Sequence, residues 1–185
     1  MKEIDIMYPD ICLQDFGRRP TTKNDIRALL QLLNEVDGNV LEIGAWYGKT
    51  TYELAIRYPE KMFFTIDWLD SDVSKREQNA RAEFDDICKY AKHLKNVEYI
   101  YKPSGQIKYE HFENIQFVFV DGDHSYDGVK VDTEKALMNL RKGSIIAWHD
   151  VRNGTFGVQK YIKEEIEPYF DVFIFKGTQI AYIKL

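Results

Sequence analysis

Residues 39–50 read NVLEIGAWYGKT, and this stretch decides the fold class. A short apolar run that ends in glycine is typical of a buried strand, and we expect a helix at residues 49–58 after the turn. Glycines at such a turn let the backbone bend tightly and let a ligand approach closely. The GxxxG spacing lacks the second glycine of the dinucleotide fingerprint GxGxxG and is one residue short of GxxxxGK[ST]. The stretch therefore predicts a strand, a nucleotide-like cofactor loop and a helix.

Strands and helices alternate along the rest of the chain. Thr22 and Asp25 form a capping-box-like pair, followed by apolar residues at helical spacing, which predicts a helix over residues 22–36. Further strands are expected at 62–66, 97–101, 116–120, 144–148, 169–175 and 179–184, and further helices from Ser74 to about Leu94, at 126–140 and at 156–166. Such alternation indicates a mostly parallel sheet with helices on both faces. We expect a Rossmann-like, doubly wound α/β fold of seven strands in the order 3-2-1-4-5-7-6, with the last strand antiparallel after a hairpin at 176–178.

The length and charge of the chain limit what it does. Its 185 residues suit a single domain over 1–185, in which residues 1–21 form an irregular N-terminal segment that is a candidate lid or dimer contact. A net charge of −5 argues against nucleic-acid and membrane partners. Cys12 and Cys88 make neither a disulfide framework nor a zinc site. Without a signal core or a membrane-length apolar run, the chain is expected to be cytoplasmic, and a homodimer is an open expectation.

Acidic residues stand at the ends of three predicted strands, where doubly wound sheets bind their ligands. Asp67, about 20 residues past the glycine loop, suits the two hydroxyls of a ribose. Asp121 and Asp150 follow neighbouring strands roughly 5 Å apart, so their carboxylates repel each other unless one is protonated or a cation lies between them. Oxygen ligands suit Mg²⁺, Ca²⁺ or Mn²⁺, and His149 shifts the choice towards Mn²⁺ or Fe²⁺. Two alternatives stay open: acids that cap helices and bond loop amides, and direct cofactor contact without a metal.

Two stretches resemble a known family. Residues 40–51, VLEIGAWYGKTT, resemble the first motif of class I S-adenosylmethionine-dependent methyltransferases, closest to the metal-dependent group around catechol and caffeoyl-CoA O-methyltransferases. Residues 117–151, FVFVDGDHSYDGVKVDTEKALMNLRKGSIIAWHDV, resemble a related broad family of sugar and natural-product methyltransferases. The resemblance covers roughly residues 22–150, and it implies an enzyme that uses S-adenosylmethionine.

The resemblance implies roles for residues at the matching positions. The glycine loop would shape the pocket for the methionine part of the cofactor, and Asp67 would bind the ribose hydroxyls. Trp68 would lie beside the adenine, and Ser104 falls where the family contacts the adenine end. The cofactor-binding residues implied in this way are Glu42, Gly44, Ala45, Trp46, Gly48, Thr50, Asp67, Trp68, Ser104, Asp121 and Gly122.

The resemblance also implies a Mg²⁺ or Mn²⁺ site at Asp121, His149 and Asp150. The last two stand where the family usually has Asp-Asn, and His124 replaces a lysine that helps to deprotonate the acceptor hydroxyl. An imidazole titrates near neutrality and can serve as that base. A metal at the site would make a substrate oxygen a better nucleophile, and the protein would hold donor and acceptor in line. We therefore expect O-methylation of a small hydroxylated acceptor such as a sugar, a diol or a catechol-like molecule.

Three other functions compete with this interpretation. A nicotinamide-dependent oxidoreductase is disfavoured by the missing fingerprint glycine and by the lack of a Tyr-x-x-x-Lys pair. A metal-dependent oxygenase or hydrolase could use His124, His149 and Asp150. A non-catalytic cofactor-binding homologue would bind the cofactor without turnover. Five aromatic residues are candidates for the acceptor pocket: Tyr8, Phe16, Tyr109, Phe112 and Phe156.

Overall fold

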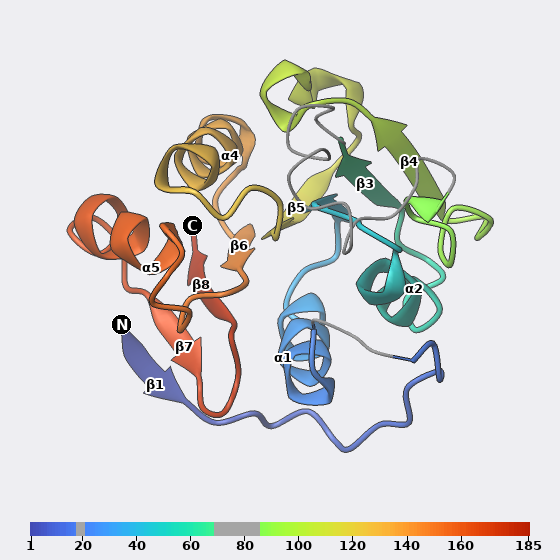
Figure 1. Cartoon of the computed structure of the whole chain (residues 1–185), viewed down its shortest axis with the longest axis horizontal. Helices are drawn as coiled ribbons and strands as arrows, with labels where there is room; N and C mark the ends of the chain where they lie inside the picture. The colour runs from blue at the N-terminus through green and yellow to red at the C-terminus, as the bar shows by residue number, and fades with distance from the viewer. Residues whose placement is uncertain (18–20, 69–85) are drawn as a thin grey trace.

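A single sheet of eight strands organises the computed structural model, which describes residues 1–17, 21–68 and 86–185 (Figure 1). The strands follow the order β1-β7-β8-β6-β5-β2-β3-β4. Their bounds are β1 Lys2–Ile4, β2 Asn39–Ile43, β3 Phe63–Asp67, β4 Val97–Tyr101, β5 Ile115–Val120, β6 Ile145–Trp148, β7 Phe173–Phe175 and β8 Ala181–Lys184.

The helices lie close to where the sequence places them. Their bounds are α1 Lys23–Leu33, α2 Lys49–Ala55, α4 Tyr126–Asn139 and α5 Val158–Tyr161, with a π-helical turn at Ile162–Ile166 and short 3₁₀ helices η2 (Ser104–Gln106) and η3 (Tyr109–His111). The predicted capping box is present, because Thr22 and Asp25 each accept a hydrogen bond from the backbone of the other. Among the described residues, none of the helices combines the length and the apolar character needed to cross a bilayer.

The predicted strand order is confirmed. In the centre of the sheet, β2 pairs in parallel with β3 and with β5, and β8 runs antiparallel to both β6 and β7. The sheet has one strand more than predicted, because Lys2–Ile4 pairs in parallel with β7 at the edge. This strand lies in the segment that the sequence predicts to be irregular, since three residues are too few for an alternating pattern to show.

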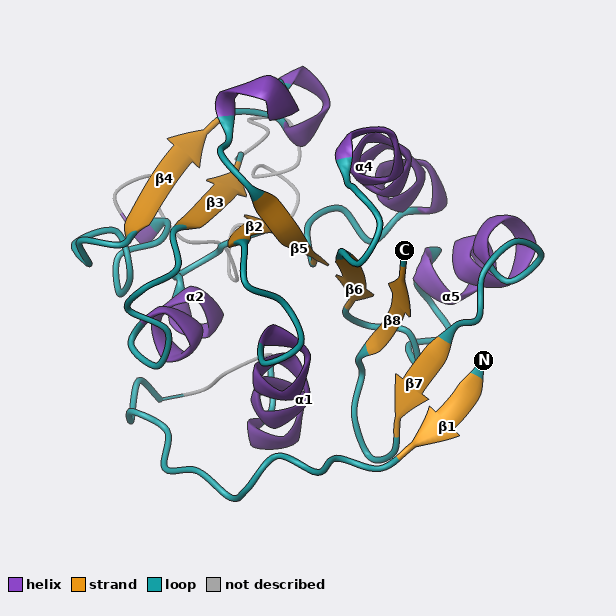
Figure 2. Ribbon diagram, turned by 180° about the vertical axis from the view of Figure 1, so that it is seen from behind, coloured by secondary structure: helices purple, strands orange, loops and turns teal. Residues whose placement is uncertain are grey.

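Helices cover both faces of the sheet. Figures 1 and 2 show α1 and α2 on one face, and α4 and α5 on the other. Alternate residues of β5 serve the two cores: Phe117 and Phe119 pack with α1 and α2, whereas Val118 and Val120 pack with α4 and α5. With both faces covered, the carboxyl ends of the parallel strands are the part of the sheet left for a ligand.

The helix predicted from Ser74 is only partly testable, because residues 69–85 lie outside the described residues. Its described end differs from the prediction: residues 87–93 form turns, although Cys88 and Ala91 are buried as expected. The N–H of Cys88 donates to the carbonyl of Trp46 at 2.5 Å, and the residue has a φ of +52°. The backbone of Cys88 is thus bonded to the glycine loop. The spacing of buried residues that predicts a helix here belongs instead to a series of turns.

Candidate active site

The loop after β2 requires its two glycines. Gly44 has a φ of +97°, and a Cβ there would lie 2.1 Å from the carbonyl oxygen of Asp121 and 2.7 Å from the Cα of Gly122. Gly48, with a φ of +74°, would place a Cβ 3.0 Å from the Cα of Cys88. Both positions adopt the left-handed backbone that favours glycine. The loop therefore packs between the end of β5 and the turn at Cys88, which brings the glycine motif and the first acid of the second motif together.

Asp67 joins the end of β3 to this loop. Its Oδ2 accepts a hydrogen bond from the N–H of Trp46 at 2.5 Å, and its Oδ1 accepts one from the N–H of Trp68 at 2.6 Å. The two tryptophans are 39% and 45% exposed, so large aromatic surfaces flank the carboxylate. A carboxylate has further lone pairs, so these bonds leave Asp67 able to accept ribose hydroxyls. Three residues predicted to bind the cofactor are thus neighbours.

Other residues predicted to bind the cofactor face the protein. Ala45 is buried in the core beneath α1 and α2, and the hydroxyl of Thr50 donates to the hydroxyl of Thr21 at 2.9 Å. Ser104 begins the short helix η2 after β4, and its side chain lies near Asp132 on α4. These side chains therefore support the loops of the predicted cofactor site from within the protein.

Glu42 lies behind the glycine loop as a buried acid. It is 2% exposed, and its Oε2 accepts hydrogen bonds from the hydroxyls of Thr51 and of Thr65, the latter at 3.1 Å. Burial raises the pKa of Glu42 to about 8, and the two threonine hydroxyls offset only part of that effect. The side chain is therefore largely protonated at neutral pH.

This buried acid makes the stability of the fold depend on pH. The unfolded chain releases the proton of Glu42 near pH 4.5 and the folded chain near pH 8, so stability falls as the pH rises across that window. Glu42→Gln cannot ionise, and at pH 8.5 it should stabilise the fold by about 4 kcal/mol relative to the wild type, with little effect at pH 4.5. Urea unfolding at both pH values measures this, with the exposed Glu60→Gln as control. Equal differences at both pH values would contradict the prediction.

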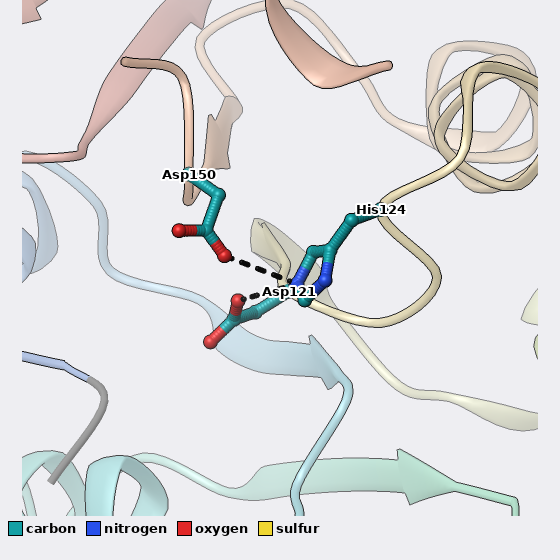
Figure 3. A group of neighbouring side chains, drawn as sticks. All are labelled: Asp121, His124 and Asp150. Atoms are coloured by element: carbon teal, nitrogen blue, oxygen red, sulfur yellow. Dashed lines mark ion pairs between the residues drawn. The ribbon is translucent and has the colours of Figure 1, made fainter. Parts of the chain in front are cut away.

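Two acids and a histidine meet at the ends of β5 and β6 (Figure 3). Asp121 follows β5 and Asp150 follows the neighbouring β6, so the strand order brings them side by side. The Nε2 of His124 lies 3.5 Å from Oδ1 of Asp121 and 3.2 Å from Oδ2 of Asp150. One ligand atom from each of the three residues can be chosen so that all lie within 4.8 Å of one another. The geometry is that of a candidate metal site.

His149, predicted as a metal ligand, lies deeper than these three residues. It is 4% exposed, and its Nδ1 is 3.2 Å from Oδ1 of Asp121 and 3.4 Å from Oδ2 of Asp150. Its Nε2 lies 3.6 Å from Oδ2 of Asp25. Burial alone would lower the pKa of His149, but the carboxylates, Asp121 foremost, raise it to about 12. Both ring nitrogens of His149 thus face carboxylates, and Nδ1 faces the same two carboxylates as Nε2 of His124 does.

Asp25 is a residue of this region that the sequence indicates only as a helix cap. Its Oδ2 accepts a hydrogen bond from the N–H of Thr22 at 2.8 Å, and its Oδ1 accepts one from the N–H of Gln179 at 2.8 Å. Although burial opposes it, the neighbouring imidazole of His149 and hydrogen bonds from Thr22 and Gln179 keep the pKa of Asp25 below its ordinary value. The Thr-x-x-Asp motif reveals the cap, but the contact with His149 depends on packing more than 100 residues apart in the chain.

An aromatic ring and a backbone contact hold His124 in place. Phe156, one of the aromatic candidates for the acceptor pocket, stacks on its imidazole with ring centroids 4.5 Å apart and an interplanar angle of 14°. The N–H of Gly157 donates to the carbonyl of His124 at 2.8 Å. Nε2 of His124 has no hydrogen-bond partner among the described residues, and it faces the two carboxylates.

Comparisons with known proteins place the chain in a family. A family model described as a methyltransferase domain matches residues 41–151, more than half of the chain, and the chain belongs to that family. Together with the fold, this makes it a class I S-adenosylmethionine-dependent methyltransferase, as its motifs predict. No curated protein matches the sequence.

Several solved structures share the fold. The TDP-rhamnose 3′-O-methyltransferase CalS11 of calicheamicin biosynthesis is 15% identical, with a TM-score of 0.63 over 87% of this chain and 77% of that one. A methyltransferase from Podospora anserina bound to S-adenosylhomocysteine is 15% identical, with a TM-score of 0.63 over 89% and 79%. An O-methyltransferase from Bacillus cereus in complex with S-adenosylhomocysteine is 20% identical, with a TM-score of 0.57 over 94% and 84%. At these identities the likeness establishes the architecture alone.

Proposed function

We propose that this methyltransferase moves the methyl group of S-adenosylmethionine to an oxygen atom of a small hydroxylated acceptor, with the help of a divalent cation. The observation that carries the proposal is the meeting of Asp121, Asp150 and His124 beside the glycine loop. Gly44 lies against the backbone of Asp121, so the loop for the donor and the group for the acceptor are adjacent. The neighbours from calicheamicin biosynthesis and Bacillus cereus, both named as O-methyltransferases, support transfer to oxygen.

The residues of the cluster fit a divalent cation. Two carboxylates held this close repel each other, and Nε2 of His124 is a buried polar atom without a hydrogen-bond partner among the described residues. Carboxylate oxygens suit Mg²⁺ or Mn²⁺, and we assign Asp121 and Asp150 as the ligands. A cation there would supply a Lewis acid that lowers the pKa of the acceptor hydroxyl. His149, predicted as a third ligand, lies beneath this pair, with Nδ1 3.2 Å from Oδ1 of Asp121 and Nε2 facing Asp25.

The remaining residues orient donor and acceptor. The glycine loop and Asp67 would hold the donor so that its methyl group faces the carboxylate pair, in line with the acceptor oxygen. His124, fixed by its stacking on Phe156, would take the hydroxyl proton on Nε2 as the new C–O bond forms and the C–S bond breaks. The rival oxygenase or hydrolase built on His124, His149 and Asp150 has less support, since the glycine loop would then have no role and the family match is to a methyltransferase domain.

Calorimetry on protein stripped with EDTA tests the assignment of the cofactor. S-adenosylhomocysteine is expected to bind with a micromolar Kd, about −8 kcal/mol of binding free energy, because the loop and Asp67 are already in place in the folded chain. Mn²⁺ is expected to bind the same protein separately, with Ca²⁺ titrated as a weaker reference. NAD serves as the control ligand and should not bind. Failure of S-adenosylhomocysteine to bind with and without Mn²⁺ would contradict the proposal.

The acceptor and the setting of the enzyme are also proposals. We propose a small-molecule acceptor and no nucleic-acid partner, which the net charge of −5 supports because phosphate backbones attract basic surfaces. A cytoplasmic location and a homodimer stay predictions, which fractionation and light scattering would test. Residues 1–17 bond to α1 and α2 of their own chain, for example through the ammonium of Lys49, which donates to the carbonyl of Phe16 at 2.7 Å.

A further inference from the structure

The segment after β4 crosses the edge of the sheet to reach α4. In the order β5-β2-β3-β4, strand β4 is outermost, whereas α4 follows β5. Strands in a sheet are roughly 5 Å apart, so the segment spans roughly 15 Å before it meets that helix. On the way the N–H of Lys102 donates to the carbonyl of Asp67 at 3.2 Å, and the ring of Tyr101 lies 4.8 Å from that of Trp68. The segment thus borders the residues that the sequence assigns to the ribose and the adenine.

Lys135 on α4 holds this segment by its backbone. Its ammonium donates to the carbonyls of Ser104 at 3.3 Å, of Gly105, and of Ile107 at 3.1 Å. An ammonium has three donors, so all of them are used on one stretch of four residues. The helix η2, which begins at Ser104, has no side-chain cap of its own. The ammonium of Lys135 therefore ties the backbone of this segment to α4.

Asp132, one helical turn before Lys135 on the same face of α4, lies beside the same segment. It is 2% exposed, a Cβ on Gly122 would lie 3.6 Å from its Oδ2, and burial raises the pKa of Asp132 to about 6, an effect that the nearby Ser104 side chain partly offsets. Its Oδ1 has no hydrogen-bond partner within the described part of the chain. A buried carboxylate oxygen in this condition is costly unless a donor reaches it. Asp132 thus lies near Ser104 and beside Gly122, two residues assigned to the cofactor.

We propose that Asp132 and Lys135 position residues 104–107 for the adenine ring of the cofactor and so make the site selective for adenine. The inference rests on the proposed function, and neither residue is expected to touch the reacting atoms. Adenine presents an amino donor at C6 and an acceptor at N1, whereas hypoxanthine reverses both. Polar groups held in one place distinguish the two patterns, and a loosened segment would distinguish them less well.

Lys135→Met tests the proposal, because methionine keeps much of the apolar stem but cannot donate to the three carbonyls. Calorimetry with S-adenosylhomocysteine and with its hypoxanthine analogue, S-inosylhomocysteine, measures affinity and selectivity together. We expect the Kd of S-adenosylhomocysteine to rise about tenfold and the preference for adenine to fall by a similar factor, since charged hydrogen bonds are lost. Lys130→Met is the matched control, because Lys130 lies on the same helix and pairs only with the exposed Glu134 at 3.7 Å among the contacts of the described chain.

Conservative variants separate positioning from a general loss of structure. Lys135→Arg should restore most of the selectivity, and Asp132→Asn, which keeps the shape of the side chain and an acceptor oxygen beside Ser104, should bind more tightly than Asp132→Ala. The affinity for Mn²⁺ should stay within about twofold in every variant, because the carboxylates of the metal site are untouched. Unchanged adenine selectivity in both Lys135→Met and Asp132→Ala would overturn the inference. Loss of S-adenosylhomocysteine binding in the wild type would overturn the proposed function instead.

Discussion

Asp150→Ala is expected to lower the rate of metal-dependent methyl transfer at least about 100-fold while S-adenosylhomocysteine still binds within about twofold. Asp150 supplies one of the two carboxylates that meet at the ends of β5 and β6, and its Oδ2 lies 3.2 Å from Nε2 of His124. Removing it leaves Asp121 as the one assigned ligand, so the affinity for Mn²⁺ should fall with the rate. The glycine loop and Asp67, which would hold the donor, do not depend on this side chain. Mn²⁺ titration, donor binding and turnover on the same preparation measure the three quantities.

The backbone at this position calls for a second variant. Asp150 has a φ of +56°, a conformation that alanine adopts less readily than asparagine does. Asp150→Asn keeps the shape and the backbone preference but removes the charge, so its loss of activity reports on the cation and not on folding. Asp171→Ala is the control, since it removes an exposed acid that pairs with Lys2 far from the site. Activity that persists in both Asp150 variants and ignores EDTA would refute the metal assignment.

Features set by local sequence were predictable. The Thr22 cap, the glycine turn and the acids after the strands depend on residues close together in the chain, and the alternation of elements sets the strand order. Parallel strands bring their carboxyl ends to one edge, which is why Asp121 and Asp150 could be paired without a structure.

Features set by packing were not predictable. The sequence indicates Asp25 only as a helix cap, yet this residue also faces His149. The contact arises because α1 packs on one face of the sheet and His149 directly follows β6. That contact occupies Nε2 of His149, while Nδ1 faces Asp121 and Asp150. In the sequence, Lys135 is one of two lysines on a predicted helix and is singled out by no motif. Its hydrogen bonds to backbone carbonyls depend on how the segment after β4 packs against α4. In each case the deciding partner is more than 20 residues away, beyond the reach of periodicity or spacing.

Gly44→Ala is expected to destabilise the fold by roughly 3 kcal/mol or more. The added Cβ would lie 2.1 Å from the carbonyl oxygen of Asp121, and backbone cannot rotate away as a flexible side chain can. The N–H of Asp121 donates to the carbonyl of Ile43 at 2.8 Å, so relieving the clash would pull apart β2 and β5, the central pair of the sheet. The same displacement would separate the donor loop from the acids of the metal site. Urea unfolding gives the loss of stability, and calorimetry with S-adenosylhomocysteine gives the loss of binding.

A matched glycine separates the clash from the cost of the backbone conformation. Gly143 has a φ of +87°, close to the +97° of Gly44, but a Cβ there would meet no atom within 4 Å. Gly143→Ala therefore carries the conformational strain alone, about 1 kcal/mol, and should leave binding of S-adenosylhomocysteine unchanged. The difference between the two variants isolates the close approach of the glycine loop to the end of β5. If Gly44→Ala were no more destabilising than Gly143→Ala, the loop would have room to move away from Asp121, and the adjacency of donor and acceptor sites would lose its structural basis.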